Sequence, residues 1–218
     1  IGSSRSLWTR NPADVSIVWT ISRRKLSTLR LLIEQITLRE IRLPLKEPFQ
    51  ISSGTVKDRR ICLLEFRSAE GITGWSECVA GDSPYYSPET IDTAWLAIRE
   101  WVAPRILGRT FEGPREINRV LNLEIRGHNM AKAAVEMGAW EVTARIQGVS
   151  LSKLLGGVRE KIEVGISLGI EDRPQLLVEK VRRSLKEGYR KVKIKIKPGK
   201  DIEYVGSVRE SVGPDAPL

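Results

Sequence analysis

Cysteine, histidine and long apolar runs are all scarce in this sequence of 218 residues. Its two cysteines, Cys62 and Cys78, stand at no metal-site spacing and are typical of reduced thiols in a cytoplasmic protein. The most apolar stretch, from Val15 to Ile33, is interrupted by Arg and Lys, so no run reaches the ~18 residues of a membrane span. It also lacks the cleavage pattern of a signal peptide. The sequence therefore predicts a cytoplasmic protein without a membrane partner.

The formal net charge of +9 is unevenly distributed along the chain. Residues 1–31 contain six Lys or Arg and one acid, Asp14, whereas the other 187 residues contain 30 basic and 26 acidic side chains. The body of the protein is therefore only mildly basic, and it has no basic patch interleaved with aromatic residues. This distribution argues against a nucleic-acid partner. Hydrophobic residues make up 41% of the chain, which is enough for a packed core.

Residues 1–31 show neither sustained alternation nor a helical stripe, and they stay unassigned as an expected disordered extension. From Ile33 onward, short runs with alternating apolar side chains predict an antiparallel meander. Pro44 and Pro48 are expected to interrupt it with a loop that runs through Gly54. The predicted strands cover residues 33–43, 60–66 and 72–78.

Helical periodicity follows the meander. In the longest helical segment, Met130, Ala134 and Met137 recur at a spacing of three to four residues, which is typical of a helix packed into a core. Together with the meander, these helices predict an α+β domain over residues 32–157. The predicted helices cover residues 88–106, 114–121 and 129–147, with a short helical turn at 150–155.

The pattern changes to alternating strands and helices after Lys161, which predicts βαβ units and a parallel sheet. A (β/α)₈ barrel needs about 250 residues, so residues 158–218 would form only the first two βα units of a truncated barrel. The chain begins at Ile1 and stops soon after Asp215, and we expect it to be a piece of a longer reading frame. The predicted strands cover 162–168 and 191–196, and the helices 174–186 and 201–212.

Four lysines alternate with three aliphatic residues between Lys191 and Lys197. A strand places every second side chain on the same face, so the lysines share one face and the aliphatic residues the other. In a barrel, the lysine face would point inward, where a neighbouring cation and desolvation lower the pKa of a lysine and make it a usable base. The alternative is a solvated face on an exposed edge strand, and the spacing alone leaves both readings open.

Several segments match a known family in order. The segment Gly188–Gly199 carries Lys193-Ile194-Lys195, and the others are Gly74–Ala80, Pro84–Ser87, Gly127–Met137 with Trp140, Gly148–Leu151, Leu154–Gly157 and Gly165–Gly169. Over about residues 33–218 they resemble the enolase superfamily (mandelate racemase/muconate lactonizing enzyme-like), in its o-succinylbenzoate synthase / N-acylamino acid racemase group. The resemblance implies an N-terminal capping domain over 32–157 and a (β/α)-barrel from 158 onward.

The resemblance also implies roles for individual residues. Lys195 would be the acid/base on one face of the substrate, and Lys193 the auxiliary lysine beside it. Ser167 would help to bind the substrate. Phe49 and Tyr86 lie in the two segments, 48–54 and 81–87, that resemble the capping-domain loops closing over the substrate. Ser53 departs from the aromatic residue that relatives often have there, which puts the substrate side chain in doubt.

The implied reaction is removal of the proton α to the carboxylate of a small molecule, with Mg²⁺ (or Mn²⁺) stabilising the enediolate. Enzymes of this group would then either eliminate water from the substrate to form o-succinylbenzoate, in menaquinone biosynthesis, or reprotonate an N-acylamino acid on the opposite face. The metal ligands and a second catalytic lysine are expected beyond residue 218, because Asp215 lies too early. The fragment is therefore expected to bind no metal and to be inactive alone, and the full-length enzyme is expected to be a homo-oligomer.

Alternatives remain. A dipeptide epimerase or a muconate cycloisomerase-like enzyme would carry the same K-x-K strand, and a non-catalytic remnant or binding protein is the alternative from another class. His128 stands at an expected helix start, where capping or packing is favoured over catalysis. Glu77 beside Trp75 could be a buried acid, but its family position implies a structural or loop role. Gly156-Gly157 lacks the strand-then-helix context of a phosphate loop.

Overall fold

The computed structural model describes residues 30–51 and 54–218. The chain divides into two compact units, one comprising residues up to Leu43 together with Arg59–Val158, the other Pro44–Asp58 together with Arg159–Leu218. The second unit therefore includes a segment taken from the middle of the first. Of the extension predicted to be disordered, residues 1–31, the part up to residue 29 lies outside the described residues.

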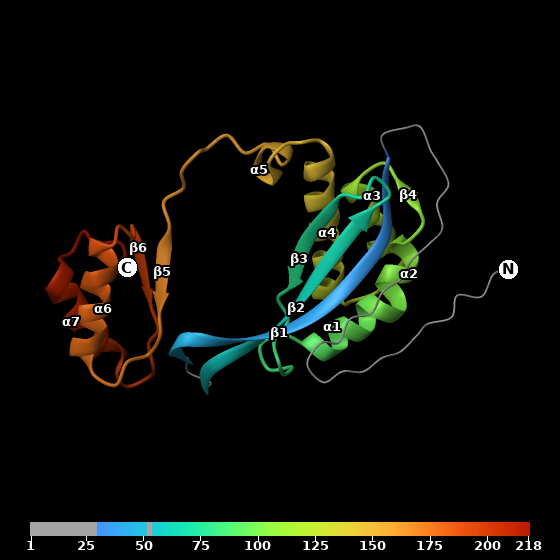
Figure 1. Ribbon diagram of the computed structural model, residues 1–218. Coiled ribbons are helices and arrows are strands. Elements are labelled where there is room, and N and C mark those ends of the chain that lie inside the picture. Colours follow the sequence, from blue (N-terminus) through green and yellow to red (C-terminus); the bar gives the residue numbers. More distant parts are fainter. Residues whose placement is uncertain (1–29, 52–53) are drawn as a thin grey trace. The chain divides into compact units, whose positions relative to one another are not determined.

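The first unit is built on a four-stranded sheet with the order β3-β2-β1-β4 (Figure 1). The predicted meander is confirmed, since β1, β2 and β3 are neighbours in chain order and β2 pairs antiparallel with β3. The two-residue β4 was not predicted, because it is too short to show alternation. It pairs antiparallel with the start of β1. The strands are β1 (Leu31–Ile51), β2 (Gly54–Ser68), β3 (Thr73–Cys78) and β4 (Thr110–Phe111).

The loop predicted from Pro44 to Gly54 is wrong, because β1 continues through both prolines and ends at Ile51. Beyond its first residues β1 has a strand neighbour on one side only, β2, since β4 reaches only Leu31 and Leu32. Residues four apart in a strand direct their backbone N–H groups to the same side. Pro44 and Pro48 can therefore both place their missing N–H on the open edge, where proline is tolerated.

One face of the sheet is covered by helices (Figure 1). The helix predicted over 88–106 is continuous, with a π-helical turn in its middle, and it begins after Thr90, whose side chain forms a capping box with Thr93. The long helix predicted over 129–147 is confirmed within one residue. The helical elements are α1 (Ile91–Ala97), η1 (Ile98–Val102), α2 (Ala103–Ile106), α3 (Pro114–Glu124), α4 (Asn129–Ile146) and α5 (Leu151–Leu154).

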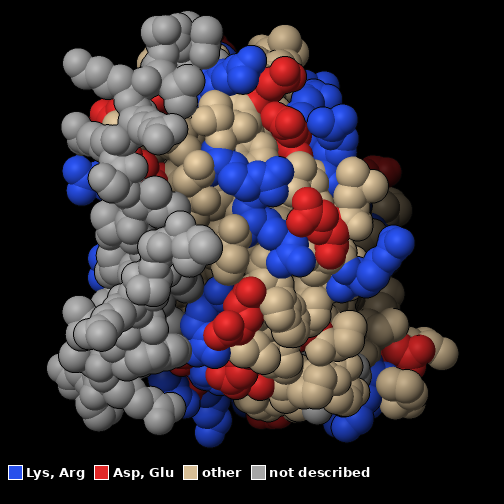
Figure 2. Space-filling model, turned by 90° about the vertical axis from the view of Figure 1, so that its right-hand side faces the viewer, with Lys and Arg blue, Asp and Glu red and all other residues tan. Residues whose placement is uncertain are grey.

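The core of the first unit lies between the sheet and α4. Helix α4 packs on β3, and the small residue Gly138 brings it against the ring of Phe66 on β2. The inward residues of β1 and β2, such as Ile36 and Leu64, are fully buried. Figure 2 shows Lys and Arg interspersed with Asp and Glu on the face turned to the viewer. No helix among the described residues is long and apolar enough to cross a membrane.

The second unit contains β5 (Gly165–Leu168), α6 (Pro174–Lys186), β6 (Lys191–Ile194) and α7 (Asp201–Val212). The predicted parallel pairing of the two strands is confirmed, and both helices have the predicted bounds. The strands are shorter than predicted. Helices α6 and α7 pack side by side (Figure 1). Their apolar faces meet the strands in a small core of Leu168, Leu177, Val181, Val192, Tyr204 and Val208.

Candidate functional site

The two faces of β6 differ as the alternation predicted. Val192 is fully buried and Ile194 packs on the same apolar cluster, so this face is covered by α6 and α7. Lys191 and Lys193 are exposed on the other face. Lys193 is the direct partner of Ser167 on β5, so the structure brings these two predicted site residues side by side on the open face.

Lys195 lies just beyond the end of β6 but still follows the strand path. Its backbone N–H donates a hydrogen bond of 3.1 Å to the carbonyl oxygen of Leu168, which continues the parallel ladder by one step. A residue two positions after Lys193 on the same path shares its face. Lys195 is half-buried. The open face therefore presents Ser167, Lys193 and Lys195 together.

A cavity of about 550 Å³ lies beside β5 in the same unit. One wall is the tip of the β1–β2 hairpin (residues 44–51), which contributes Phe49, and another is β5 with Ser167. Helix α6 supplies the charged rim with Lys180 and Arg183. Two of the predicted substrate-binding residues therefore line one cavity, which mixes apolar walls with side chains of both charges.

The hairpin tip is attached to the end of β5 through backbone contacts. The N–H of Ile170 donates a hydrogen bond of 3.0 Å to the carbonyl oxygen of Gln50. A Cβ at Gly169 would lie 3.1 Å from that oxygen and 3.6 Å from the ring of Phe49, so glycine permits this close approach. Gln50 lies an even number of residues from Pro44 and Pro48, so its backbone groups point to the same edge of β1. The open edge of β1 therefore forms the contact with β5.

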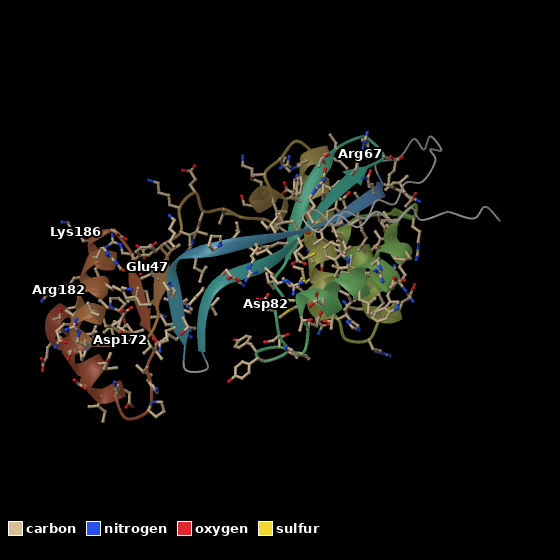
Figure 3. The ribbon with its side chains drawn as sticks, turned by 60° about the horizontal axis from the view of Figure 1, so that its bottom comes forward. Glu47, Arg67, Asp82, Asp172, Arg182 and Lys186 are labelled. Carbon is tan, nitrogen blue, oxygen red and sulfur yellow. The ribbon has the colours of Figure 1, made fainter. Side chains whose placement is uncertain are left out.

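An ion-pair cluster joins the same elements. Lys180 on α6 lies 2.9 Å from a carboxylate oxygen of Glu47 on the hairpin tip and 2.9 Å from one of Glu171 after β5. The hydrogen bond and charge of Lys180 lower the pKa of Glu47, and hydrogen bonds to Glu171 and Glu47 raise the pKa of Lys180. Figure 3 shows Glu47 beside α6, with Arg182 and Lys186 on the outer side of that helix.

Sequence reasoning missed this cluster. Lys180 and Glu47 are separated by 133 positions, and each belongs to a charged stretch that looks like an ordinary solvated face. The i,i+4 rule that reveals ion pairs within a helix gives no signal for such a distant pair. Only the return of the hairpin tip to β5 brings the three side chains together.

Tyr86 belongs to the first unit and is 97% exposed. Its loop is anchored at the following residues, because the carboxylate of Glu89 accepts hydrogen bonds from the backbone N–H groups of Met130 and Ala131 at the start of α4. The loop tip, with Tyr85 also exposed, projects from this anchor. Tyr86 is thus not among the residues that the second unit groups around its cavity.

His128 and Glu77 were the weaker candidates. His128 precedes α4 with a left-handed φ of 49° and makes no capping hydrogen bond through its side chain. Its ring packs on Trp101 with the centroids 5.0 Å apart, so of the two expected roles packing is confirmed. Glu77 is exposed, not a buried acid. Within residues 30–51 and 54–218, no group of three or more His, Cys, Asp or Glu side chains could hold a metal ion.

The chain is similar to known proteins in both sequence and fold. Residues 33–156 match the model of the mandelate racemase / muconate lactonizing enzyme N-terminal domain. The chain belongs to this family. Its antiparallel sheet with helices on one face is the capping domain that the resemblance implied, and this domain accounts for most of the first unit.

Two curated relatives extend the family match into the second unit. The chain is 39% identical over 186 residues to an o-succinylbenzoate synthase of Geobacillus stearothermophilus, which covers 85% of this chain and 49% of the relative. It is 41% identical over 186 residues to an N-succinylamino acid racemase of Thermus thermophilus, with 85% and 50% covered. The chain therefore spans about half the length of the curated relatives it matches.

A solved structure shows the same fold with a bound metal. The dipeptide epimerase of Enterococcus faecalis, complexed with Mg and the dipeptide L-Leu-L-Tyr, superimposes with a TM-score of 0.74 at 27% identity, covering 86% of this chain and 52% of the epimerase chain. The relatives of this chain thus include a lyase, a racemase and an epimerase, and the structure of the epimerase contains magnesium.

Proposed function

We propose that the chain is the N-terminal half of a divalent-metal-dependent enzyme that removes the proton α to the carboxylate of a small substrate. The proposed activity is o-succinylbenzoate synthesis, N-acylamino acid racemisation or both, with Lys195 as acid/base and Lys193 as its auxiliary. The observation that supports it is the open face shared by Ser167, Lys193 and Lys195, with the aliphatic residues of β6 turned to the helices. Along this face Lys191 and Lys193 are exposed and Lys195 is half-buried.

The chemistry of this face follows from its charges. Lys195 would take the α-proton as the C–H bond breaks, and the electron pair would move toward the carboxylate to form an enediolate. Lys193 would donate a hydrogen bond to the substrate carboxylate. Ser167 would donate a hydrogen bond to the substrate, and Phe49 would line the cavity beside it. Tyr86 is proposed to reach the substrate when its loop closes.

A divalent metal would supply charge stabilisation of the enediolate when bound. Mg²⁺ requires several oxygen ligands, mostly carboxylates and water. The described residues offer no such set, so they do not fit a magnesium site alone, and the ligands are proposed to lie on strands that follow Leu218.

We further propose that the second unit is the start of a (β/α)-barrel whose third strand begins at the C-terminal residues. The N–H of Val192 donates a hydrogen bond of 3.0 Å to the carbonyl oxygen of Pro217, and Leu218 packs on the apolar cluster of β6. In a parallel ladder this bond makes Leu218 the partner of Val192. The third residue after Leu218 would then stand opposite Lys195 on the open face, and we expect an acidic metal ligand there.

The longer reading frame is the direct test. We expect an Asp or Glu three residues after Leu218 and a lysine on a later strand, and their absence would refute the enzyme assignment. With the full-length protein and Mg²⁺, Lys195→Ala should abolish exchange with deuterated solvent for the substrate α-proton that faces Lys195. Lys191→Ala is the matched control, because Lys191 is an exposed lysine on the same strand, two residues before Lys193, and it should retain exchange.

Two rival functions have distinct outcomes. Dipeptide epimerisation gains support from the dipeptide-bound relative of similar fold. A substrate panel of an N-succinylamino acid, the o-succinylbenzoate precursor and a dipeptide separates these activities by which α-proton exchanges. A non-catalytic remnant would exchange none of them. Stoichiometric binding of Mg²⁺ by the 218-residue chain would contradict the proposed location of the ligands.

A further inference from the structure

We propose that Lys180 is a positioning residue that clamps the tip of the β1–β2 hairpin, residues 44–51, onto the end of β5 by holding Glu47 and Glu171 at the same time. The clamp itself concerns only the described residues of the second unit. Its consequence for substrate choice rests on the function proposed above.

The geometry of Lys180 is that of a bridge between two carboxylates. Its Nζ lies 2.9 Å from an oxygen of Glu47 and 2.9 Å from an oxygen of Glu171. An ammonium group has three donors and no fixed plane, so it can bond to two carboxylates that approach from different elements. The Lys180 side chain is 28% exposed and that of Glu171 15%, whereas that of Glu47 is 63% exposed, so only the Glu171 side of the bridge is shielded from water.

A backbone contact lies next to the bridge and depends on the same placement. Gln50, three residues after Glu47, accepts the hydrogen bond from the N–H of Ile170, the residue immediately before Glu171. The ionic contact and the backbone contact therefore join the same two segments at two adjacent points. Gly169 allows the second contact, since a side chain there would press on Gln50.

The clamp bears on the cavity because the clamped segment forms its wall. Phe49 lies between the two contact points at Glu47 and Gln50, and its ring lies beside Gly169, two residues from Ser167. A shift of the hairpin tip would therefore move Phe49 relative to Ser167. Lys180 itself lies on the rim of this cavity, so the amide of Ile170 tests the clamp independently of any contact between Lys180 and a ligand.

The test uses the amide proton of Ile170 as a reporter in the 218-residue chain. An exposed ion pair contributes little to global stability, so its loss should loosen the docked tip without unfolding the unit. Lys180→Met and Glu47→Gln should each raise the exchange rate of the Ile170 amide by about fivefold. The double variant should add little to either single change. The Lys195 amide, bonded to Leu168 inside the strand pair, should keep its rate.

Lys186→Met is the matched control. Lys186 is an exposed lysine on the same helix, and no ion pair of its side chain is recorded in the described part of the chain. This change should leave both amides unaffected. Equal Ile170 exchange in the parent chain and in both clamp variants would overturn the proposal. Equal acceleration at Ile170 and Lys195 would also overturn it, because it would indicate general loosening.

A charge reversal separates the clamp from the proposed reaction. Glu47→Lys with Lys180→Glu should restore part of the Ile170 protection that either change alone removes, and only part, because the carboxylate introduced at position 180 repels Glu171. In the full-length enzyme, Lys180→Met should raise KM more than it lowers kcat, with a shift in preference among substrates of different side chain. Restored protection with no α-proton exchange in any variant would count against the reaction and leave the clamp intact.

Discussion

Gly138 on α4 lies directly against the ring of Phe66 on β2. A Cβ built at Gly138 would overlap that ring, and Phe66 is fully buried between the sheet and the helix. The absence of a side chain at this one position therefore sets how closely α4 approaches the sheet. This relationship determines the thickness of the core in the first unit.

Gly138→Ala should destabilise the protein by a net value of about 1 to 2 kcal/mol. Alanine would gain up to about 1 kcal/mol in helix propensity, but overpacking a full core costs typically 1–3 kcal/mol or more, so the clash should prevail. Urea unfolding followed by circular dichroism measures the difference. Gly206→Ala in α7 is the control, because no atom lies within 4 Å of its added Cβ, and it should be neutral or stabilising. A stabilised Gly138→Ala would show that the ring can move aside.

The two cysteines should react slowly in the folded protein. Cys62 and Cys78 face each other across the β2–β3 ladder, both are buried, and both are free thiols. Burial, with a smaller effect of Cys78, raises the pKa of Cys62 to about 12. The reactive thiolate at pH 8 should then be rarer by about a thousandfold than for a thiol with the ordinary value of 9.0. Iodoacetamide labelling with mass spectrometry should show both sites modified only after denaturation.

The carboxylate of Glu89 should matter more for its hydrogen bonds than for its charge. It accepts from Met130 and Ala131, which lack helical partners at the start of α4. Glu89→Ala should cost about 1–2 kcal/mol of unfolding free energy, whereas Glu89→Gln keeps an acceptor and should cost less than half as much. Thermal or urea denaturation distinguishes them. Equal losses in the two variants would assign the effect to the charge.

The clamp at Lys180 should depend on pH at both extremes. The pKa of Glu47 is lowered from 4.5, so its contribution is complete above that value and is lost as the pH falls through the lowered pKa. The pKa of Lys180 is raised from 10.5, so its contribution is complete below that value and is lost as the pH rises through the raised pKa. Protection of the Ile170 amide, corrected for intrinsic exchange, should be constant from about pH 5 to about pH 10 and should fall below pH 4.5. Lys180→Met should remove the acid dependence.

The sequence predicts those features that local periodicity encodes. Alternation on β6 separates Val192 from Lys193, and the same rule predicts their opposite faces in the structure. The bounds of α6 and α7 follow from proline and glycine at their ends. The meander follows from three alternating runs.

Features set by distant contacts are not encoded locally. Pro44 and Pro48 indicate a loop unless the open edge of β1 is known, because proline is excluded only where its N–H would have to pair. The partnership of Glu47 with Lys180 depends on the hairpin tip returning to β5. Thr110 and Phe111 form strand β4 only because they pair with the start of β1. In each case tertiary pairing overrides the local signal.

Residues 44–58 belong to the second unit although they lie in sequence inside the first. No single cut in the polypeptide can therefore separate the two units without leaving one of them incomplete. A hybrid that joins one relative up to the position of residue 158 to the following residues of another would bring together a hairpin tip and a strand end from different parents. The match between position 47 and position 180 would decide whether such a hybrid retains its cavity.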